Sequence, residues 1–331
     1  MINSYIGHDS QIYGVEESRL VGGKGDGMRL FRVKNGKGLE FTVSADRCAD
    51  ISRLSYRGYN YGYFSPNGYV APAYYDDKGN GFLKSFTAGF LTTCGLTAAG
   101  NSCIDQGKEL PLHGTVSNCP AEYIYYTIDE EWIIIHALIG QRQVLSDKLI
   151  LNREIKTSLK NNKVIIVDNI ENVGDKETPL MMLYHFNMGY PLLNEHAILN
   201  IPSKKVIARN EYAAKDIDIW DKISKPKSGI DEQCYYHEFE EEGSAALFNP
   251  IINKGIAITF DSKNLNYFTE WKMMGFKDYV LGLEPGNCHP DGRHKMRQDG
   301  KLIFLQPGEK KTYEVLLTIV EDLPQWNALQ S

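Results

Sequence analysis

The stretch Trp132-Ile-Ile-Ile-His-Ala-Leu-Ile139 decides the fold class of this chain. It is rich in β-branched and aromatic residues and less than half as long as a membrane-spanning helix, so it predicts a strand. Similar short segments surround it, most of them separated by Asp, Asn, Gly or Lys residues that suit tight turns. These further predicted strands cover residues 39–44, 123–128, 149–155, 164–170, 181–186, 256–260, 279–283, 302–305 and 313–320.

The order of these segments favours an all-β fold. No long segment repeats its apolar residues every 3.6 positions, and the strands do not alternate with amphipathic helices as in βαβ units. The pattern therefore predicts an antiparallel architecture, a large β-sandwich. We find no linker, internal repeat or low-complexity segment. Because all-β folds can be long, we expect one domain over residues 1–331.

Two segments lack a clear strand pattern. Residues 56–107 are rich in Gly, Tyr, Asn and Pro and predict long ordered loops. Loops of this length inside a compact protein are usually functional, so we expect them to form a wall or rim of a binding cleft. Residues 231–242 are strongly charged and predict a solvated surface connection.

Composition narrows the classes of partner. A hydrophobic content of 42% and a charged content of 24% are those of a globular protein, and the net charge of −6 with dispersed basic residues argues against nucleic acid or an anionic membrane as partner. The first ten residues lack a signal-peptide pattern, which favours the cytoplasm. We expect a monomer or a homodimer. Six cysteines without a CxxC pair are interpreted as reduced thiols: Cys48, Cys94, Cys103, Cys119, Cys234 and Cys288.

The first candidate for chemistry is a carboxylate at the end of a predicted strand. In Tyr279-Val-Leu-Gly-Leu-Glu-Pro-Gly286, the apolar run ends on Glu284, where Pro and Gly favour a turn. A pocket above this strand end would be lined by polar and titratable groups. Three such residues follow in the loop: His289, Asp291 and Arg293.

Two histidines are the candidate partners of Glu284. His113 and His185 each lie next to a strand end or a turn residue. Imidazole exchanges protons near neutral pH and burial can raise the pKa of a carboxylate, so the three residues suffice for acid/base catalysis. The alternative is that the histidines are satisfied structural residues and that Glu284 caps its own turn.

Trp271 and Lys272 form a second candidate. An indole ring stacks on the C–H face of a pyranose, so Trp271 next to polar residues fits sugar recognition, and the alternative is a core position. Lys272, His289 and Arg293 would suit an anionic sugar, unless they face solvent. The histidine spacing does not support a metal site, and no phosphate-binding loop, dinucleotide motif or GxSxG elbow is present. We expect neither a metal nor a cofactor.

Taken together, the motifs resemble those of the aldose 1-epimerase (galactose mutarotase-like) superfamily, and most closely its branch of uncharacterised proteins described as a domain of unknown function. The motifs occur in the expected order across about 260 residues. They are Asp46-Arg-Cys-Ala-Asp-Ile51, Thr93-Cys-Gly-Leu96, Pro111-Leu-His-Gly114, Leu183-Tyr-His-Phe-Asn-Met-Gly-Tyr-Pro191, Leu281-Gly-Leu-Glu-Pro-Gly-Asn287 and Leu302-Ile-Phe-Leu-Gln-Pro-Gly-Glu309.

The resemblance implies a β-supersandwich that binds a monosaccharide in an open cleft and needs no cofactor. It implies that Glu284 takes the proton from the anomeric hydroxyl and that His185, followed by Phe186 and Asn187, protonates the ring oxygen. His113 would contact the sugar. The implied activity is that of an isomerase, an aldose 1-epimerase.

The chain departs from the superfamily pattern at two places. Authentic mutarotases have an Asn before the second histidine and one further residue between it and the Phe-Asn pair. Their sugar-binding Asp and Arg have no secure counterpart here, and the candidates for these positions are Asp218, Asp221, Arg47 and Arg53. The identity of the sugar therefore stays open.

Two other classes of function fit the same residues. A sugar-binding or sugar-sensing protein would keep the cleft without turnover. A glycoside hydrolase or lyase would need a second carboxylate near Glu284, for which Asp291 is the nearest candidate in the sequence.

Overall fold

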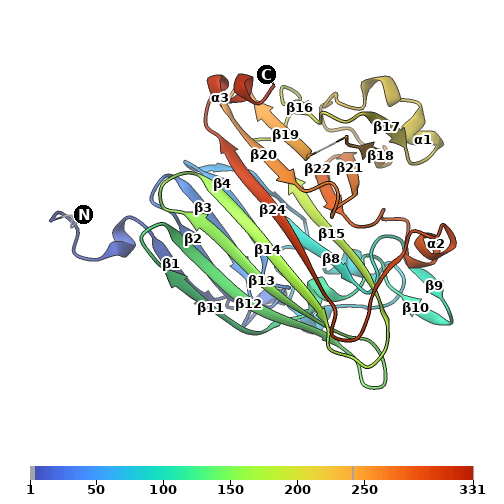
Figure 1. Ribbon diagram of the computed structural model, residues 1–331. Coiled ribbons are helices and arrows are strands. Elements are labelled where there is room, and N and C mark those ends of the chain that lie inside the picture. Colours follow the sequence, from blue (N-terminus) through green and yellow to red (C-terminus); the bar gives the residue numbers. More distant parts are fainter. Residues whose placement is uncertain (1–3, 241, 331) are drawn as a thin grey trace.

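The computed structural model describes residues 4–240 and 242–330. Within them the chain forms three large β-sheets and two small two-stranded sheets, and every pairing between the named strands is antiparallel (Figure 1). The predicted all-β supersandwich is confirmed, whereas the expectation of one domain stays a prediction. No helix in the described part of the chain is long and apolar enough to cross a membrane.

The largest sheet has eight strands. The stretch that decides the fold class lies in β12, where side chains alternate between buried and half-buried positions, as expected for a sheet with one face on the core. The neighbouring strand β13 shows the same alternation. In spatial order the strands are β11 (Ala121–Ile128), β12 (Trp132–Arg142), β13 (Lys148–Ser158), β14 (Lys163–Asn172), β24 (Lys310–Val320), β20 (Lys254–Phe260), β19 (Gly243–Asn249) and β16 (Ile198–Asn200).

A seven-stranded sheet positions the site. Its strand β15 is buried on both faces, which explains why its sequence is a continuous apolar run without alternation. In spatial order its strands are β17 (Lys205–Ala208), β18 (Gln233–Glu238), β21 (Tyr267–Met274), β22 (Tyr279–Gly286), β15 (Thr178–Met188) and β23 (Ile303–Leu305), and β8 (Leu91–Leu96) also pairs with β15.

The remaining elements are smaller. The five-stranded sheet contains β1 (Gly14–Arg19), β2 (Arg29–Lys34), β3 (Leu39–Ser44), β4 (Asp50–Tyr56) and β5 (Tyr59–Asn60). The two-stranded sheets are β6 (Tyr63–Phe64) with β7 (Ala88–Gly89), and β9 (Cys103–Asp105) with β10 (Lys108–Leu110). Short helices are α1 (Glu211–Ala214), α2 (Arg293–Gln298) and α3 (Leu323–Ala328), with 3₁₀ turns at Asp9–Gln11, Gly23–Gly25, Pro72–Tyr74, Gly81–Lys84, Val116–Asn118 and Ile217–Ile219.

Two sequence-based expectations need correction. Residues 231–242 are not a surface connection, because they contain β18, in which four consecutive residues from Cys234 to His237 are buried. Residues 56–107 are loops only in part, because they include β8, a strand that is buried on both faces and paired with β15. Strand β18 was not predicted because charged residues flank it. Strand β8 was not predicted because its apolar and polar residues do not alternate.

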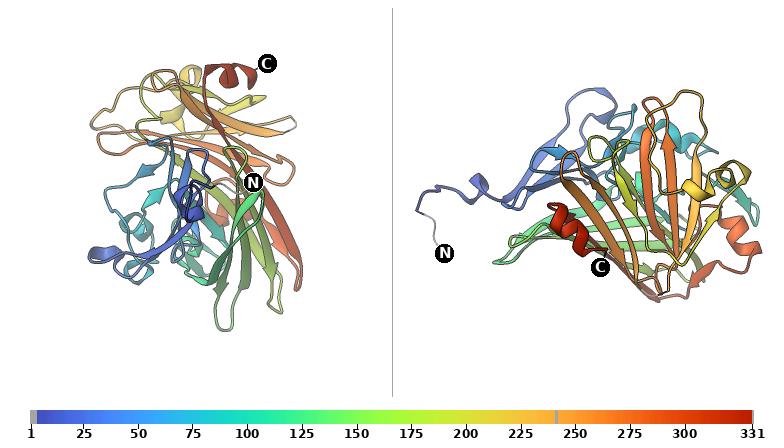
Figure 2. Two further views of the ribbon diagram at one scale, coloured as in Figure 1. Left: turned by 90° about the vertical axis from the view of Figure 1, so that its left-hand side faces the viewer. Right: turned by 90° about the horizontal axis from the view of Figure 1, so that it is seen from above.

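The three large sheets share one apolar core, and Figure 2 shows them from two further sides. A polar cluster lies inside this core, where Arg153 of β13 donates hydrogen bonds to Asp168 of β14 at 2.9 and 2.7 Å and to Asp50 of β4 at 2.7 Å. Thr93 of β8 donates to Asp50 at 2.6 Å, and Tyr184 of β15 donates to Asp168 at 2.8 Å. These five residues, the Arg153 cluster, join all three sheets.

The Arg153 cluster predicts a large loss of stability when its cation is removed. Arg153→Met leaves Asp50 and Asp168 buried without their partner, and we expect the free energy of unfolding to fall by about 3–5 kcal/mol. Urea denaturation followed by circular dichroism measures it. Arg32→Ala is the control, because the Arg32–Glu16 pair is exposed at 3.9 Å and its loss should cost less than about 1 kcal/mol. Equal losses in the two variants would contradict the role of the cluster.

Candidate active site

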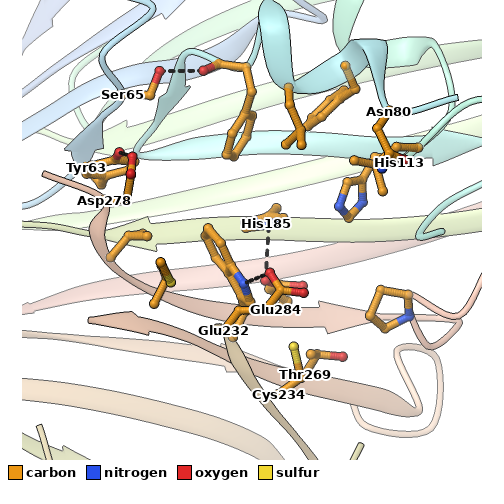
Figure 3. A pocket seen from close by; sticks show the side chains of 18 of the residues that line it. Tyr63, Ser65, Asn80, His113, His185, Glu232, Cys234, Thr269, Asp278 and Glu284 are labelled. Atoms are coloured by element: carbon orange, nitrogen blue, oxygen red, sulfur yellow. Dashed lines mark hydrogen bonds and ion pairs between the residues drawn. The ribbon is translucent and has the colours of Figure 1, made fainter. Parts of the chain in front are cut away.

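One cavity of about 590 Å³ opens between the seven-stranded sheet and loops that precede and follow β8 (Figure 3). Its floor carries residues of β15, β21 and β22, and its opposite wall carries residues of the segments 63–86 and 112–113. The expected wall is therefore formed by part of the segment 56–107. Three candidates from the sequence and the candidate stacking residue line this cavity: His113, His185, Glu284 and Trp271.

Strand geometry aims His185 into the cavity. Successive side chains of a strand point to opposite faces, so Tyr184 enters the core and joins the Arg153 cluster while His185 faces the cavity. His185 is only 4% exposed. Asn187 donates from Nδ2 to the backbone carbonyl of His185 at 2.9 Å and does not line the cavity itself.

Glu284 lies beside His185 on the adjacent strand. The register of β15 and β22 pairs Phe186 with Leu283, which brings Glu284 Oε1 to 3.2 Å from His185 Nε2 without the alignment of a hydrogen bond. Gly282 occurs on the same face, where a Cβ atom would collide with Glu284 Oε1. A glycine at this position therefore leaves room for the carboxylate. Strand β22 continues to Gly286, so Glu284 lies within the strand and not at its end.

A tight turn presents His113 from the opposite wall. His113 adopts a φ of 59° and Gly114 a φ of 71°, and a Cβ at Gly114 would collide with the carbonyl oxygens of Ala98 and Gly95. The requirement for glycine explains the His-Gly pair in the sequence. The His113 ring is 5.5 Å from the His185 ring at an interplanar angle of 74°.

Burial shifts the pKa values of all three groups toward their uncharged forms. It raises the pKa of Glu284 well above 4.5, with the Glu232 carboxylate adding to the rise. Burial, followed by repulsion from His113, lowers the pKa of His185 well below 6.5. Burial and the Arg209 cation lower the pKa of His113 to about 4. Burial therefore favours neutral imidazoles beside a protonated carboxyl group at this site.

Buried polar atoms without a partner gather in this cavity. Four of the ten such side-chain atoms in the described residues belong to its lining: His113 Nδ1, His185 Nδ1, Thr269 Oγ1 and Glu284 Oε1. Unpaired buried polar atoms cost stability and are rare in native proteins. Their concentration in one hollow indicates a polar ligand that pairs with them.

Sequence reasoning missed four charged residues that line the cavity: Asp231, Asp278, Arg209 and Glu232. Arg209, which follows β17, is held by Asp291 Oδ1 at 3.2 Å, by Asn101 Oδ1 at 3.0 Å and by the Pro290 carbonyl at 3.1 Å. Glu232 lies just before β18 and accepts from Trp271 Nε1 at 2.7 Å. Arg209 and Glu232 belong to segments without a sequence motif, so the local sequence could not have identified either residue.

Lys272 points away from the cavity. It neighbours Trp271 on β21 and so faces the opposite side of the sheet, where it is 5% exposed. Its Nζ donates to the Trp220 carbonyl and lies 4.0 Å from Glu270 Oε1. Glu270 in turn lies 3.2 Å from His237 Nε2 in the same buried polar group.

Two predicted arginines are structural. Arg293 donates to Asp105 at 2.8 Å and to the Thr97 carbonyl at 3.1 Å and does not line the cavity. Arg47 is buried and donates to backbone carbonyls of three separate segments, at Ser117, Val70 and Ser85. The structure brings neither guanidinium to Glu284.

The loop residues His289 and Asp291 lie behind the cavity wall. The His289 ring stacks on Tyr236 at 3.8 Å, and burial lowers its pKa to about 4. Asp291 accepts from Arg209 and, at 2.7 Å, from Tyr236 Oη. Asp291 therefore positions Arg209 and is not the second carboxylate of the cavity.

The remaining candidates also lie outside the cavity lining. Arg53 lies with its guanidinium over the Phe64 ring at 4.2 Å, and neither Asp218 nor Asp221 reaches the cavity. All six cysteines are free. Among residues 4–240 and 242–330 no group of three or more His, Cys, Asp or Glu side chains is arranged to hold a metal ion.

The fold is of the galactose mutarotase-like class, as comparison with solved structures shows. The chain belongs to the family described as "Domain of unknown function (DUF4432)", whose model matches residues 25–319. Together with the structural matches below, this confirms the resemblance to the galactose mutarotase-like superfamily and to that branch of it. A comparison with curated proteins returns no match.

Several solved structures share the fold. A proposed aldose 1-epimerase from Klebsiella pneumoniae subsp. pneumoniae MGH 78578 is 25% identical with a TM-score of 0.91, over 97% of this chain and 88% of that one. A galactose mutarotase-like protein from Clostridium acetobutylicum is 14% identical with a TM-score of 0.69, over 95% and 100% of the chains. Galactose 1-epimerase from Lactobacillus acidophilus NCFM is 13% identical with a TM-score of 0.63, over 94% and 100%.

Proposed function

We propose that this protein is an aldose 1-epimerase that interconverts the anomers of a monosaccharide in the cavity around Glu284. The observation that carries the proposal is the contact of 3.2 Å between Glu284 and His185, both buried and both facing a hollow with unpaired polar atoms. A cavity of about 590 Å³ lies within the usual range for small-molecule sites. The similarity to the Klebsiella protein supports the same reaction class.

The reaction needs one base and one acid. The base takes the proton of the anomeric hydroxyl while the acid protonates the ring oxygen, so the C1–O bond of the ring breaks and an open aldehyde forms. Rotation about C1–C2 exposes the other face of the aldehyde, and closure returns both protons. Glu284 acts as the base and His185 as the acid, and His113 shares the proton at the ring oxygen.

The site supplies these roles by moving one proton. Before a sugar binds, burial favours a protonated Glu284 and a neutral His185, because it disfavours charge on either group. Transfer of that proton from Glu284 to His185 creates the carboxylate and the imidazolium without changing the net charge of the cavity. The hydroxyl and ring oxygens of a bound sugar can pair with both ions and lower the cost of this transfer.

Trp271 forms the side of the cavity against which a pyranose can stack. Its ring lies 5.2 Å from the His185 ring, and its N–H is fixed by Glu232. Aromatic rings commonly cover the C–H face of a ligand while polar groups fix its orientation. Thr269 Oγ1 and the Arg209 guanidinium line the same cavity and serve as hydroxyl contacts.

A rival function is sugar binding without turnover, and the first prediction distinguishes the two. Glu284→Gln removes the base but keeps the shape of the side chain, so we expect anomer exchange to slow roughly 10²- to 10⁴-fold while sugar binding persists. Polarimetry on a panel of aldoses measures the rate, and calorimetry measures binding. Glu238→Gln is the control, because Glu238 is exposed at the far end of β18. Equal activity of Glu284→Gln and the wild type would remove Glu284 from the mechanism.

The second prediction concerns pH. A second proton enters the Glu284–His185 pair only well below pH 6.5, because the pKa of His185 is lowered, and the shared proton is kept to well above pH 4.5, because the pKa of Glu284 is raised. We therefore expect kcat/KM, corrected for uncatalysed exchange, not to fall when the pH is lowered through 6.5 to about pH 6. A loss of half the activity near pH 6.5, the pKa of an ordinary histidine, would contradict the buried environment of His185.

A further inference from the structure

The charges of the cavity are unevenly distributed. Three exposed carboxylates line its mouth, Asp231, Glu232 and Asp278, and Glu284 lies at its depth. Arg209 is the one cation that lines the cavity in the described part of the chain, and Asp291 pairs with it at 3.2 Å. The mouth therefore presents an excess of negative charge, in a chain whose net charge is −6.

Strand pairing gathers the acidic residues at one end of the sheet. Gln233 of β18 pairs with Lys272 of β21, and Met274 of β21 pairs with Tyr279 of β22. The residues just before β18 and β22 therefore lie at the same end of β21, and Figure 3 shows Glu232 next to Glu284 and Asp278 next to Tyr63. The antiparallel register, not local sequence, creates this acidic mouth.

Two of the carboxylates are anchored by aromatic residues. Trp271 Nε1 donates to Glu232 Oε2 at 2.7 Å, and Tyr63 Oη donates to Asp278 Oδ1 at 3.2 Å. The face of an indole ring attracts a cation, and a carboxylate held at its edge adds to that attraction. Carboxylates and an aromatic face are the groups that suit an organic ammonium ion.

Two unpaired polar atoms lie inward of this mouth and indicate a ligand there. Thr269 Oγ1 and Glu284 Oε1 are buried and unpaired, and both residues line the same cavity inward of the acidic rim. They share adjacent strands, since Thr269 pairs with Glu284 in the register of β21 and β22. A ligand that pairs with them extends toward Trp271 and Glu232.

We propose that the cavity takes amino sugars, aldoses that carry an ammonium group, in preference to neutral sugars, and that it disfavours sugar phosphates and sugar acids. This inference rests on the proposed function, because it names the substrate class of that site. An ammonium group near Glu232 replaces water around the rim carboxylates, whereas a phosphate there meets three like charges and no free cation. It also replaces the expectation of an anionic sugar, because Lys272 and Arg293 lie elsewhere.

The test compares each parent sugar with a derivative that carries a charged group. Rates of anomer exchange are measured by polarimetry at low ionic strength and pH 6.5 for glucosamine, galactosamine and mannosamine, each against its parent sugar, and for glucose 6-phosphate. We expect kcat/KM to be about tenfold higher for at least one amino sugar than for its parent, and about tenfold or more lower for glucose 6-phosphate than for glucose. Added salt should reduce both differences.

One substitution isolates the charge. Glu232→Gln keeps an acceptor for Trp271 Nε1 and removes the negative charge, so the ratio of kcat/KM for the amino sugar to kcat/KM for its parent sugar should fall several-fold. Glu238→Gln, at the other end of β18, should leave the preference unchanged. The readout is the ratio of kcat/KM for the amino sugar to kcat/KM for its parent sugar. A general structural effect would lower both values and leave this ratio unchanged.

The possible results separate this inference from the proposed function. Equal kcat/KM for amino and parent sugars, with activity retained, overturns the inference and leaves the epimerase. Tighter binding of an amino sugar than its parent by calorimetry, with no acceleration of exchange, supports the charge preference and overturns the epimerase. If no sugar is bound or turned over, both are overturned.

Discussion

The buried guanidinium of Arg153 is the interaction on which the rest of the structure depends. Its side chain is fully enclosed and joins Asp168 on a neighbouring strand to Asp50 in another sheet. Two buried carboxylates without this cation would have to be neutralised or hydrated, and either change would separate the sheets. Buried ion pairs contribute little net stability compared with apolar residues, but they strongly disfavour alternative packings in which one partner is missing. The cluster therefore determines how the three sheets meet.

The same constraint extends to the cavity through one strand. Tyr184 donates to Asp168 inside the core, and the next residue, His185, faces the cavity. The position of His185 against Glu284 thus follows from how β15 is held on its other face. The apolar surroundings that fix the strand also exclude water from the two titratable groups, and this raises the pKa of Glu284 and lowers that of His185. The packing of β15 therefore both positions His185 and shifts the pKa values of His185 and Glu284.

Sequence reasoning could predict what is local. The apolar runs predicted β12 to β15 and β22, and turn chemistry together with the superfamily motifs singled out His113, His185 and Glu284, which the structure places together. It could not predict what depends on register. Arg209 and Glu232 reach the cavity only because β17, β18 and β21 pair as they do, and a charged flank disguised β18 as surface. Lys272 was predicted at the site but lies outside it. Successive side chains of a strand point to opposite faces, so Lys272 lies on the face opposite to that of Trp271.

The central claim is that one buried carboxyl and one buried imidazole act together on the anomeric centre of a sugar. A crystal structure of the Glu284→Gln variant with an aldose bound tests it most directly. The account predicts the anomeric oxygen within about 2.6–3.2 Å of residue 284 and the ring oxygen at a similar distance from a nitrogen of His185. A sugar bound with its anomeric carbon toward the mouth, or outside this cavity, would contradict it.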